Sequence, residues 1–323
     1  MLYPFTFHPI FKERIWGGRN LTRLYGKNLP ANQPIGESWE ISDRPGDASV
    51  IANGPLAGKD LRWLMENHAS ELLGLATALN GRFPLLIKLL DAQEKLSLQV
   101  HPPAHEAVKL GGEPKTELWH IADATPGAEL FVGLKHGVTR AEFERKLHDG
   151  SVADCFHRIP VRSGDTMFLP SGRVHAIGAG LVIFEIQQNS DTTYRVFDWN
   201  RVGLDGKPRE LHVAQSLASI DFNDFEPSLV QTELSGDANL QRGVLVQAAL
   251  FTVESWQLAA RAEARLKPRT MQILACLSGD LRVAVDDAAV EITPGGFCLV
   301  PACLGSVTVD APGAAKLLWI HAG

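Results

Sequence analysis

The chain has 323 residues, of which 45% are hydrophobic and 21% are charged, and its formal net charge is −6. This length and composition exclude a disordered chain and leave room for two domains of ordinary size. The negative charge argues against nucleic acid as a partner, so an anionic ligand would have to be held by local Lys and Arg side chains.

The cysteines and the N-terminus indicate the compartment. The four cysteines, Cys155, Cys276, Cys298 and Cys303, contain no Cys-x-x-Cys pair, which argues against a zinc knuckle and a disulfide framework. Charged residues at positions 12–14 interrupt the N-terminus before an apolar run is long enough for a signal peptide. No stretch approaches the roughly 20 apolar residues of a membrane span. We therefore expect a cytoplasmic protein with no membrane partner.

The first 55 residues mix aromatic residues with turn residues, in Trp16-Gly17-Gly18 and in the segment 36–42. Alternation within residues 36–42 predicts a short strand. The acidic residue Glu37 lies in this strand beside Trp39. Tryptophans and acidic residues together could line a sugar site, and Trp16 and Glu37 are candidates for such a role. A buried core position is nevertheless commoner for tryptophan.

A helix and a buried strand follow. Apolar residues at helical spacing predict a packing helix over residues 61–79, and the run 84–91 predicts a buried strand. Lys88 stands in the middle of this strand and requires a partner if it is buried. An anionic ligand and an internal carboxylate are the two candidates.

Two further strands carry polar side chains on one face. In the stretch Ser-Leu-Gln-Val-His-Pro, a period of two places Ser97, Gln99 and His101 on the same face. The prolines that follow end the strand directly after His101. The next alternating stretch places Lys115 and Glu117 on one face in the same way.

The stretch from residue 169 to 201 is richest in reactive side chains. His175 lies between two turns, and a β-rich run from Leu181 to Gln187 follows. Glu185 and Gln187 share one face of this apolar run, which suits a strand whose inner side lines a cavity. The charged residues that follow, up to position 201, could instead form a solvated loop.

His101, Glu117 and His175 therefore provide two imidazoles and one carboxylate from three predicted strands. Such a set suits zinc or iron(II), and Gln99 could add a carbonyl oxygen. The chain has eleven histidines, so purely structural roles are the alternative.

The second half repeats part of the first. A polar helix is expected over residues 139–149, a connecting helix over 209–220 and a polar linker over 223–236. Beyond them, short strands and a second Gly-turn, strand and proline pattern at 294–301 echo the pattern at 163–170, with Ser306 opposite His175. We expect a mainly β protein of two related barrels, residues 1–222 and 237–323, with chemistry in the first only.

Several motifs together resemble a known family. They are Gln-Val-His-Pro, Lys-Thr-Glu, Pro-x-Gly-x-Val-His-x-Ile and Glu-Ile-Gln-Gln-x-Ser-Asp-x-Thr-Tyr-Arg, with Trp-Gly-Gly and Gly-Glu-Ser-Trp-Glu-Ile-Ser near the N-terminus. This set is similar to that of the type I phosphomannose isomerases, also called mannose-6-phosphate isomerases, in their short bacterial form. The resemblance runs to about residue 220, and the remainder matches by architecture.

The resemblance implies two cupin, or double-stranded β-helix, barrels with a few helical insertions, a catalytic N-terminal one and a metal-free C-terminal one. It implies one zinc ion per chain, bound by Gln99, His101, Glu117 and His175. It places the family's substrate-binding arginine at Arg195 and a second basic residue at Arg201. It also places Lys88, Ser97 and Lys115 in the lining of the site.

The implied reaction interconverts mannose 6-phosphate and fructose 6-phosphate through an enediol, with a sugar phosphate as the partner of a monomer or homodimer. A zinc-bound water, Glu185, Lys115 or Glu37 could each remove the proton. An iron(II) cupin dioxygenase is one alternative, but it gives no reason for Arg195, Arg201 and Lys88 to cluster. A non-catalytic cupin that binds sugar phosphates is the other.

Overall fold

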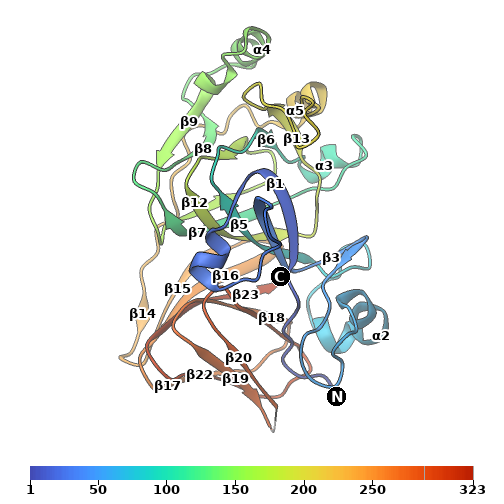
Figure 1. The fold of residues 1–323 in the computed structure, drawn as a ribbon, viewed down its shortest axis with the longest axis vertical. Coiled ribbons are helices and arrows are strands. Elements are labelled where there is room, and N and C mark those ends of the chain that lie inside the picture. The colour runs from blue at the N-terminus through green and yellow to red at the C-terminus, as the bar shows by residue number, and fades with distance from the viewer. Residues whose placement is uncertain (287, 323) are drawn as a thin grey trace.

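The computed structural model describes residues 1–286 and 288–322, which form two stacked β-barrels (Figure 1). The upper barrel has strands β1 (Ile10–Gly18), β2 (Ile35–Ile41), β5 (Leu85–Ala92), β6 (Leu98–Val100), β7 (Glu117–Ala124), β8 (Glu129–Leu134), β9 (Phe156–Pro160), β10 (Thr166–Leu169), β11 (His175–Ile177), β12 (Leu181–Gln188) and β13 (Tyr194–Phe197). The lower barrel has β14 (Ser235–Gly236), β15 (Leu240–Gln247), β16 (Phe251–Leu258), β17 (Ala262–Leu266), β18 (Gln272–Ser278), β19 (Leu281–Val285), β20 (Ala288–Ile292), β21 (Phe297–Val300), β22 (Val307–Ala311) and β23 (Ala315–Ala322).

The remaining elements lie outside the strands of the two barrels. They are α1 (Asn20–Tyr25), the strand pair β3 (Asp43–Arg44) and β4 (Asp47–Ala48), α2 (Leu61–Leu73), α3 (Ala104–Ala107), α4 (Arg140–Asp149), the 3-10 turn η1 (Val152–Cys155) and α5 (Val213–Ser219). The expected polar helix is α4, which Thr139 caps. The expected connecting helix over residues 209–220 is shorter than predicted and spans Val213–Ser219, as α5.

Each barrel consists of two antiparallel sheets. In the upper barrel the strand orders are β1-β2-β5-β12-β7-β10 and β13-β6-β11-β8-β9, and in the lower they are β14-β15-β16-β23-β18-β21 and β17-β22-β19-β20. The orders correspond strand by strand through the two large sheets, and the echoed patterns form the edge strands β10 and β21. The prediction of a mainly β protein with two cupin barrels is confirmed, and the sequence echo marks equivalent strands.

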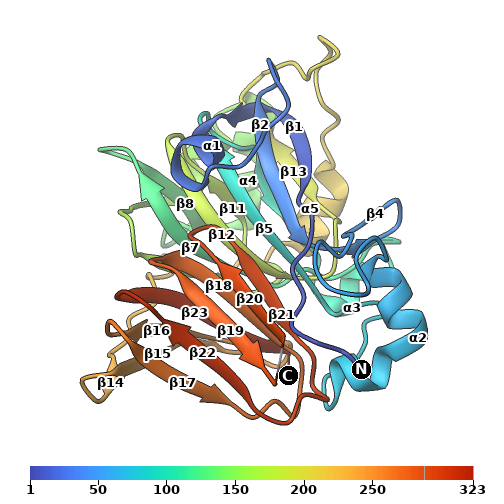
Figure 2. The same cartoon turned by 60° about the horizontal axis from the view of Figure 1, so that its bottom comes forward.

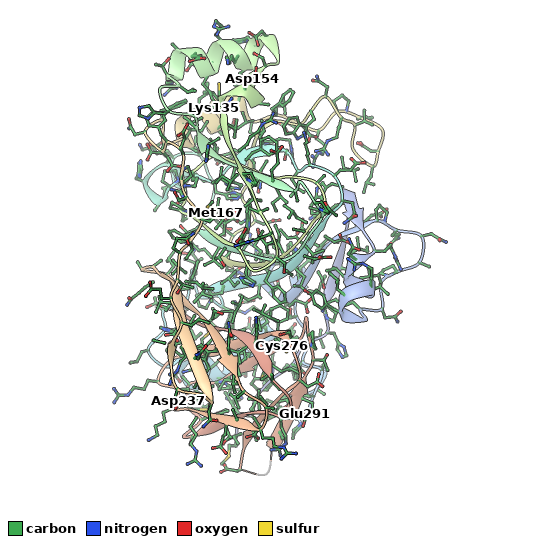
Figure 3. The ribbon with its side chains drawn as sticks, turned by 90° about the vertical axis from the view of Figure 1, so that its left-hand side faces the viewer. Lys135, Asp154, Met167, Asp237, Cys276 and Glu291 are labelled. Atoms are coloured by element: carbon green, nitrogen blue, oxygen red, sulfur yellow. The ribbon has the colours of Figure 1, made fainter. Side chains whose placement is uncertain are left out.

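The two large sheets pack face to face, and Figure 3 shows Met167 in one barrel and Cys276 in the other. Ile87 of β5 and Phe184 of β12 belong to the apolar cluster between the sheets, where the rings of Phe184 and Phe297 lie 5.6 Å apart. Side chains alternate along a strand, so the neighbouring residues of β5 and β12 point into the upper barrel. This packing is what buries both faces of these strands.

The N-terminal segment and α2 also contact the lower barrel, beside which α2 lies in Figure 2. The Phe5 amide donates to the Leu299 carbonyl at 2.8 Å. Helix α2 ends at Leu73, six residues before its predicted end, because Gly74 has a φ of 61° and its Cα lies against the backbone of Arg269. These contacts cross between the predicted domains, so the boundaries 1–222 and 237–323 stay a prediction.

The lower barrel has different residues at the positions equivalent to the charged residues of the upper barrel. Strand register places Gln272, Glu254 and Trp319 where the upper barrel has Glu117, Lys88 and Glu185. Trp319 stacks on Trp256 with 5.4 Å between ring centroids, and its Nε1 donates to Gln272. The lower barrel therefore has a glutamine in place of Glu117 and a tryptophan in place of Glu185, and its metal-free character stays a prediction.

No described helix is both long enough and apolar enough to cross a membrane.

Candidate metal and substrate site

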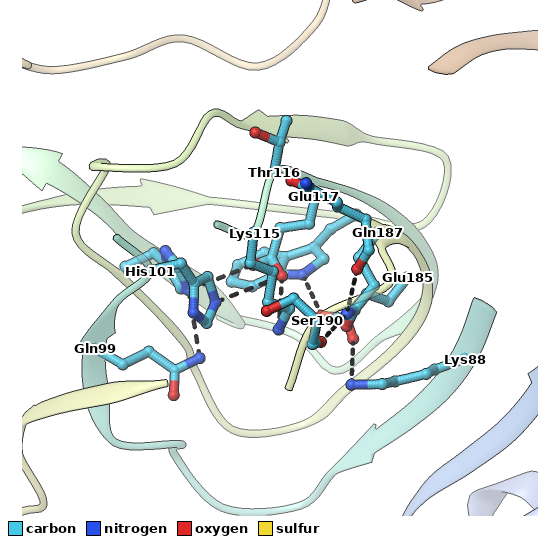
Figure 4. Close-up of polar contacts among 12 residues, drawn as sticks. Lys88, Gln99, His101, Lys115, Thr116, Glu117, Glu185, Gln187 and Ser190 are labelled. Carbon is cyan, nitrogen blue, oxygen red and sulfur yellow. Dashed lines mark hydrogen bonds and ion pairs between the residues drawn. The ribbon is translucent and has the colours of Figure 1, made fainter. Parts of the chain in front are cut away.

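His101, Glu117 and His175 meet inside the upper barrel. Figure 4 shows His101 and Glu117 of this cluster with the neighbouring Gln99 and Lys115. Glu117 begins β7, His175 begins β11 and His101 follows directly after β6. His175 Nε2 lies 3.3 Å from Glu117 Oε1, and His101 Nε2 lies 3.6 Å from Glu117 Oε2. The two imidazoles and the carboxylate predicted from the sequence therefore form one buried cluster, in which each residue is at most 1% exposed.

Two backbone carbonyls orient the imidazoles. Nδ1 of His101 lies 2.8 Å from the Thr192 carbonyl oxygen, and Nδ1 of His175 lies 2.9 Å from that of Arg173. A carbonyl oxygen can only accept, so each Nδ1 carries the proton and each Nε2 presents a lone pair to the cluster. Such hydrogen bonds are typical of histidines that ligate metals.

The carbonyl of Thr192 is held in place by Gln187 and Ser190. The Gln187 amide donates to the Ser190 carbonyl at 2.7 Å, and the Thr192 amide donates to the Ser190 hydroxyl at 3.2 Å. Gln187 therefore shapes the loop behind His101, whereas the sequence had suggested that it lines the cavity together with Glu185.

The charges in the cluster suit a cation. Burial raises the pKa of Glu117, but Lys115 and then His101 outweigh that effect, so its pKa lies well below the ordinary value. Burial, reinforced by Lys115, lowers the pKa of His101 to about 4, and burial lowers the pKa of His175. At neutral pH the cluster is thus two neutral imidazoles and a carboxylate.

Lys115 Nζ lies 3.0 Å from Glu117 Oε2 and forms an ion pair with it, whereas Glu117 Oε1 and His101 Nε2 are buried without a hydrogen-bond partner among the described residues. Buried polar atoms without partners are costly, and these converge on one point. Their nitrogen and oxygen donors match the ligand preferences of zinc and iron(II). The residues present therefore fit a bound divalent metal.

Gln99 connects this cluster to a cavity. Its Nε2 lies 3.3 Å from Nε2 of His175, and exchanging the amide nitrogen and oxygen would direct the oxygen to the same place. Gln99 also lines a cavity of about 590 Å³. The predicted site residues in the cavity wall are Trp16, Glu37, Lys88, Ser97, Gln99, Lys115, Glu185 and Arg195.

A buried charge network forms one wall of the cavity. Lys88 Nζ lies 3.1 Å from Glu185 and 3.7 Å from Glu37, which also accepts from Arg14 and from Trp39. Burial lowers the pKa of Lys88, but Glu185 and then Glu37 raise it more, so the net shift is upward and Lys88 stays charged. Of the two candidate partners predicted for Lys88, the structure therefore shows the internal carboxylate.

We expect Lys88→Met to destabilise the protein by about 3 kcal/mol, because Glu185 is left as a buried charge without its cation. Urea unfolding measures this change in the free energy of unfolding. The double variant Lys88→Met, Glu185→Gln should recover part of the loss. Lys109→Met, which breaks an exposed ion pair with Glu106, is the matched control and should leave the free energy unchanged.

Arg195 and Arg201 have different surroundings. Arg195 lines the cavity, donates from Nη1 to the Glu210 carbonyl at 2.8 Å, and has a buried Nε without a partner. Arg201 does not line the cavity; it pairs with Asp198 at 2.8 Å and donates to the Lys95 carbonyl. The structure therefore brings Arg195 to the site and places Arg201 beside it.

The sequence reasoning missed several residues of the wall. Trp119 donates to Glu185 at 2.9 Å and shares the inward face of β7, so the period of two could have indicated it. Arg14 and Arg209 also line the cavity. No spacing rule could have identified Arg209, because it lies in an irregular segment.

Two cupin barrels, one with a buried histidine, glutamate and histidine cluster beside a polar cavity, define a bicupin with a candidate metal centre. Family models for the type I phosphomannose isomerase catalytic domain and the mannose-6-phosphate isomerase cupin domain match residues 5–119 and 241–322. The chain belongs to the type I phosphomannose isomerases, and is thus an aldose-ketose isomerase, as the motifs predict.

Relatives match over nearly the whole chain. The Bacillus subtilis protein named "Probable mannose-6-phosphate isomerase GmuF" is 37% identical over 96% of this chain and 97% of its own. The mannose-6-phosphate isomerase ManA of the same organism is 36% identical over 95% and 96%. A crystal structure of mannose 6-phosphate isomerase from Bacillus subtilis superposes with a TM-score of 0.90 at 32% identity, covering 99% of this chain and all of that one.

Proposed function

We propose that this protein is a zinc-dependent isomerase that interconverts mannose 6-phosphate and fructose 6-phosphate through an enediol. The observation that carries the proposal is the convergence of His101 Nε2 and Glu117 Oε1, two buried donor atoms without a hydrogen-bond partner among the described residues, with His175, next to a cavity lined by Arg195. Family membership supplies the reaction class, and the cavity wall supplies groups for both ends of a sugar phosphate.

His101, Glu117 and His175 would hold the metal, with the Gln99 amide oxygen as a fourth ligand. A bound zinc ion would supply an electrophile for the oxygens at C1 and C2, where negative charge develops as the enediol forms. The carbonyls of Thr192 and Arg173 keep the imidazoles oriented throughout the reaction.

Arg195 would bind the phosphate. It is a cavity cation that pairs with no carboxylate among the described residues, and guanidinium groups bind phosphate through two parallel hydrogen bonds. Ser97 and Trp16 would contact the sugar carbons and hydroxyls, since both line the same cavity. These residues contribute positioning, which holds C1 and C2 against the metal side.

The proton on C2 must move to C1. Glu37 is a poor base for this step, because Lys88, Arg14 and its hydrogen bonds outweigh burial and hold its pKa at about 2. Glu185 and Lys115 remain as titratable side chains of the cavity wall that could carry the proton. In either case the base takes the proton from C2, a second proton moves from O2 to O1, and the base returns its proton to C1.

A coupled assay that detects fructose 6-phosphate formed from mannose 6-phosphate tests the proposal. The purified protein should contain about one zinc per chain by elemental analysis, lose its activity when a chelator removes the metal, and regain it when zinc is added. Activity that persists at zero metal content would refute zinc dependence. Iron with oxygen consumption, or binding of mannose 6-phosphate without turnover, would refute the isomerase.

A further inference from the structure

The segment that follows β13 carries a second cavity arginine. Directly after Asp198, both Trp199 and Asn200 have a φ of 56°, so the chain turns sharply there. The indole of Trp199 donates to the Leu96 carbonyl at 2.7 Å and so holds the turn against the segment before β6. The chain then returns, and Arg209 lines the same cavity as Arg195.

Asp198 holds this returning segment. Its carboxylate is 4% exposed and accepts from Nε of Arg209 at 2.6 Å, while Nη2 of Arg209 contacts its other oxygen. A two-point contact of this kind fixes the plane of a guanidinium group. Nη1 of Arg209 then remains as the donor nitrogen that Asp198 does not use.

The carboxylate of Asp198 also binds Arg201, which connects two segments of the chain. Arg201 donates from Nη2 to Asp198 at 2.8 Å and from Nη1 to the backbone carbonyl of Lys95. Its hydrogen bonds thus join the segment after β13 to the segment before β6. Among the described residues of the cavity wall, Arg209 is present and Arg201 is not.

Strand register gives the separation of the two ends of the site. Arg195 lies opposite Gln99, and Gln99 lies opposite His175 on the next strand. The backbone positions of Arg195 and His175, which belongs to the histidine cluster, are therefore two strand spacings, roughly 10 Å, apart. An open six-carbon sugar with a terminal phosphate can extend over a gap of this order, which places the phosphate at the arginines and the reacting carbons at the cluster.

We propose that Arg209, positioned by Asp198, is the second arginine of the phosphate site with Arg195, and that Arg201 holds the loop without contacting the substrate. This inference rests on the proposed function for the identity of the sugar phosphate. It reassigns the second basic residue, which the family resemblance had placed at Arg201. A phosphate with two negative charges would then bind two guanidinium groups. Arg195 pairs with no carboxylate among the described residues, and Arg209 is held in a fixed orientation by Asp198.

Kinetics of Arg209→Gln, with inorganic phosphate as the probe, test the assignment. We expect the KM for mannose 6-phosphate to rise about 30-fold, since a charge-assisted hydrogen bond is lost, while kcat changes by less than about threefold. The affinity for inorganic phosphate, measured by calorimetry, should fall by a similar factor. Arg209→Lys should be intermediate, because it keeps the charge and loses the two-point contact.

Arg201→Gln and Asp198→Asn separate a phosphate ligand from a loop anchor. Arg201→Gln should change the KM by less than about threefold. Asp198→Asn should raise the KM, and the double variant Asp198→Asn, Arg209→Gln should have the same KM as Arg209→Gln alone. Wild-type KM and phosphate affinity in Arg209→Gln, or a larger rise in Arg201→Gln, would overturn the inference. If the wild-type protein lacks isomerase activity the proposed function fails, and the phosphate titration still decides the role of Arg209.

Discussion

The His101→Ala variant is expected to lose bound zinc and isomerase activity together, with turnover falling at least about 1,000-fold. His101 supplies a neutral Nε2 that lies 3.6 Å from Glu117 and has no other partner among the described residues. Its removal leaves Glu117 facing His175 with one ligand missing. Elemental analysis and the coupled assay on the same sample measure both losses.

A folding defect can be separated from a ligand defect. His148→Ala removes an exposed histidine from α4 and should keep both zinc and activity. His101→Gln retains a polar group of similar size and should preserve the circular dichroism spectrum while still losing metal affinity. Normal zinc content in a folded His101→Ala protein would remove His101 from the ligand set.

The Arg195→Ala variant should keep its zinc and lose about 100-fold to 1,000-fold in kcat/KM for mannose 6-phosphate. Arg195 lines the cavity from β13 and belongs to neither the histidine cluster nor its hydrogen bonds. Because binding energy from the phosphate holds the distant carbons in place, part of the loss should occur in kcat. Steady-state kinetics with parallel metal analysis give both quantities.

Two comparison variants sharpen this result. Arg195→Lys keeps the charge but cannot make two parallel hydrogen bonds, so it should recover only part of the activity. Arg265→Gln removes an exposed arginine of the lower barrel that pairs with Glu263, and it should behave as the wild type. A wild-type kcat/KM in Arg195→Ala would show that the phosphate binds elsewhere.

Local patterns predicted much of the barrel and of the metal cluster. Period-two alternation placed Gln99 with His101 and indicated the inward face that carries Glu117 and Glu185, because side-chain direction along a strand depends only on the strand itself. The echoed patterns of a Gly turn, an apolar run and a proline identified β10 and β21 as equivalent strands, because these residues mark where each strand begins and ends. Helix α2 was predicted too long, because its end depends on the contact of Gly74 with the other barrel.

The sequence by itself determined the donor types, the strands that carry them and, through its motifs, the family. Only the tertiary structure decided which groups meet: Lys88 with Glu185, His101 with the Thr192 carbonyl, and Arg209 in the cavity wall. The first two pairs are 97 and 91 residues apart in the sequence, and Arg209 lies in an irregular segment. Their contacts depend on strand register and loop path, which are set by packing across the whole barrel and leave no local repeat in the sequence.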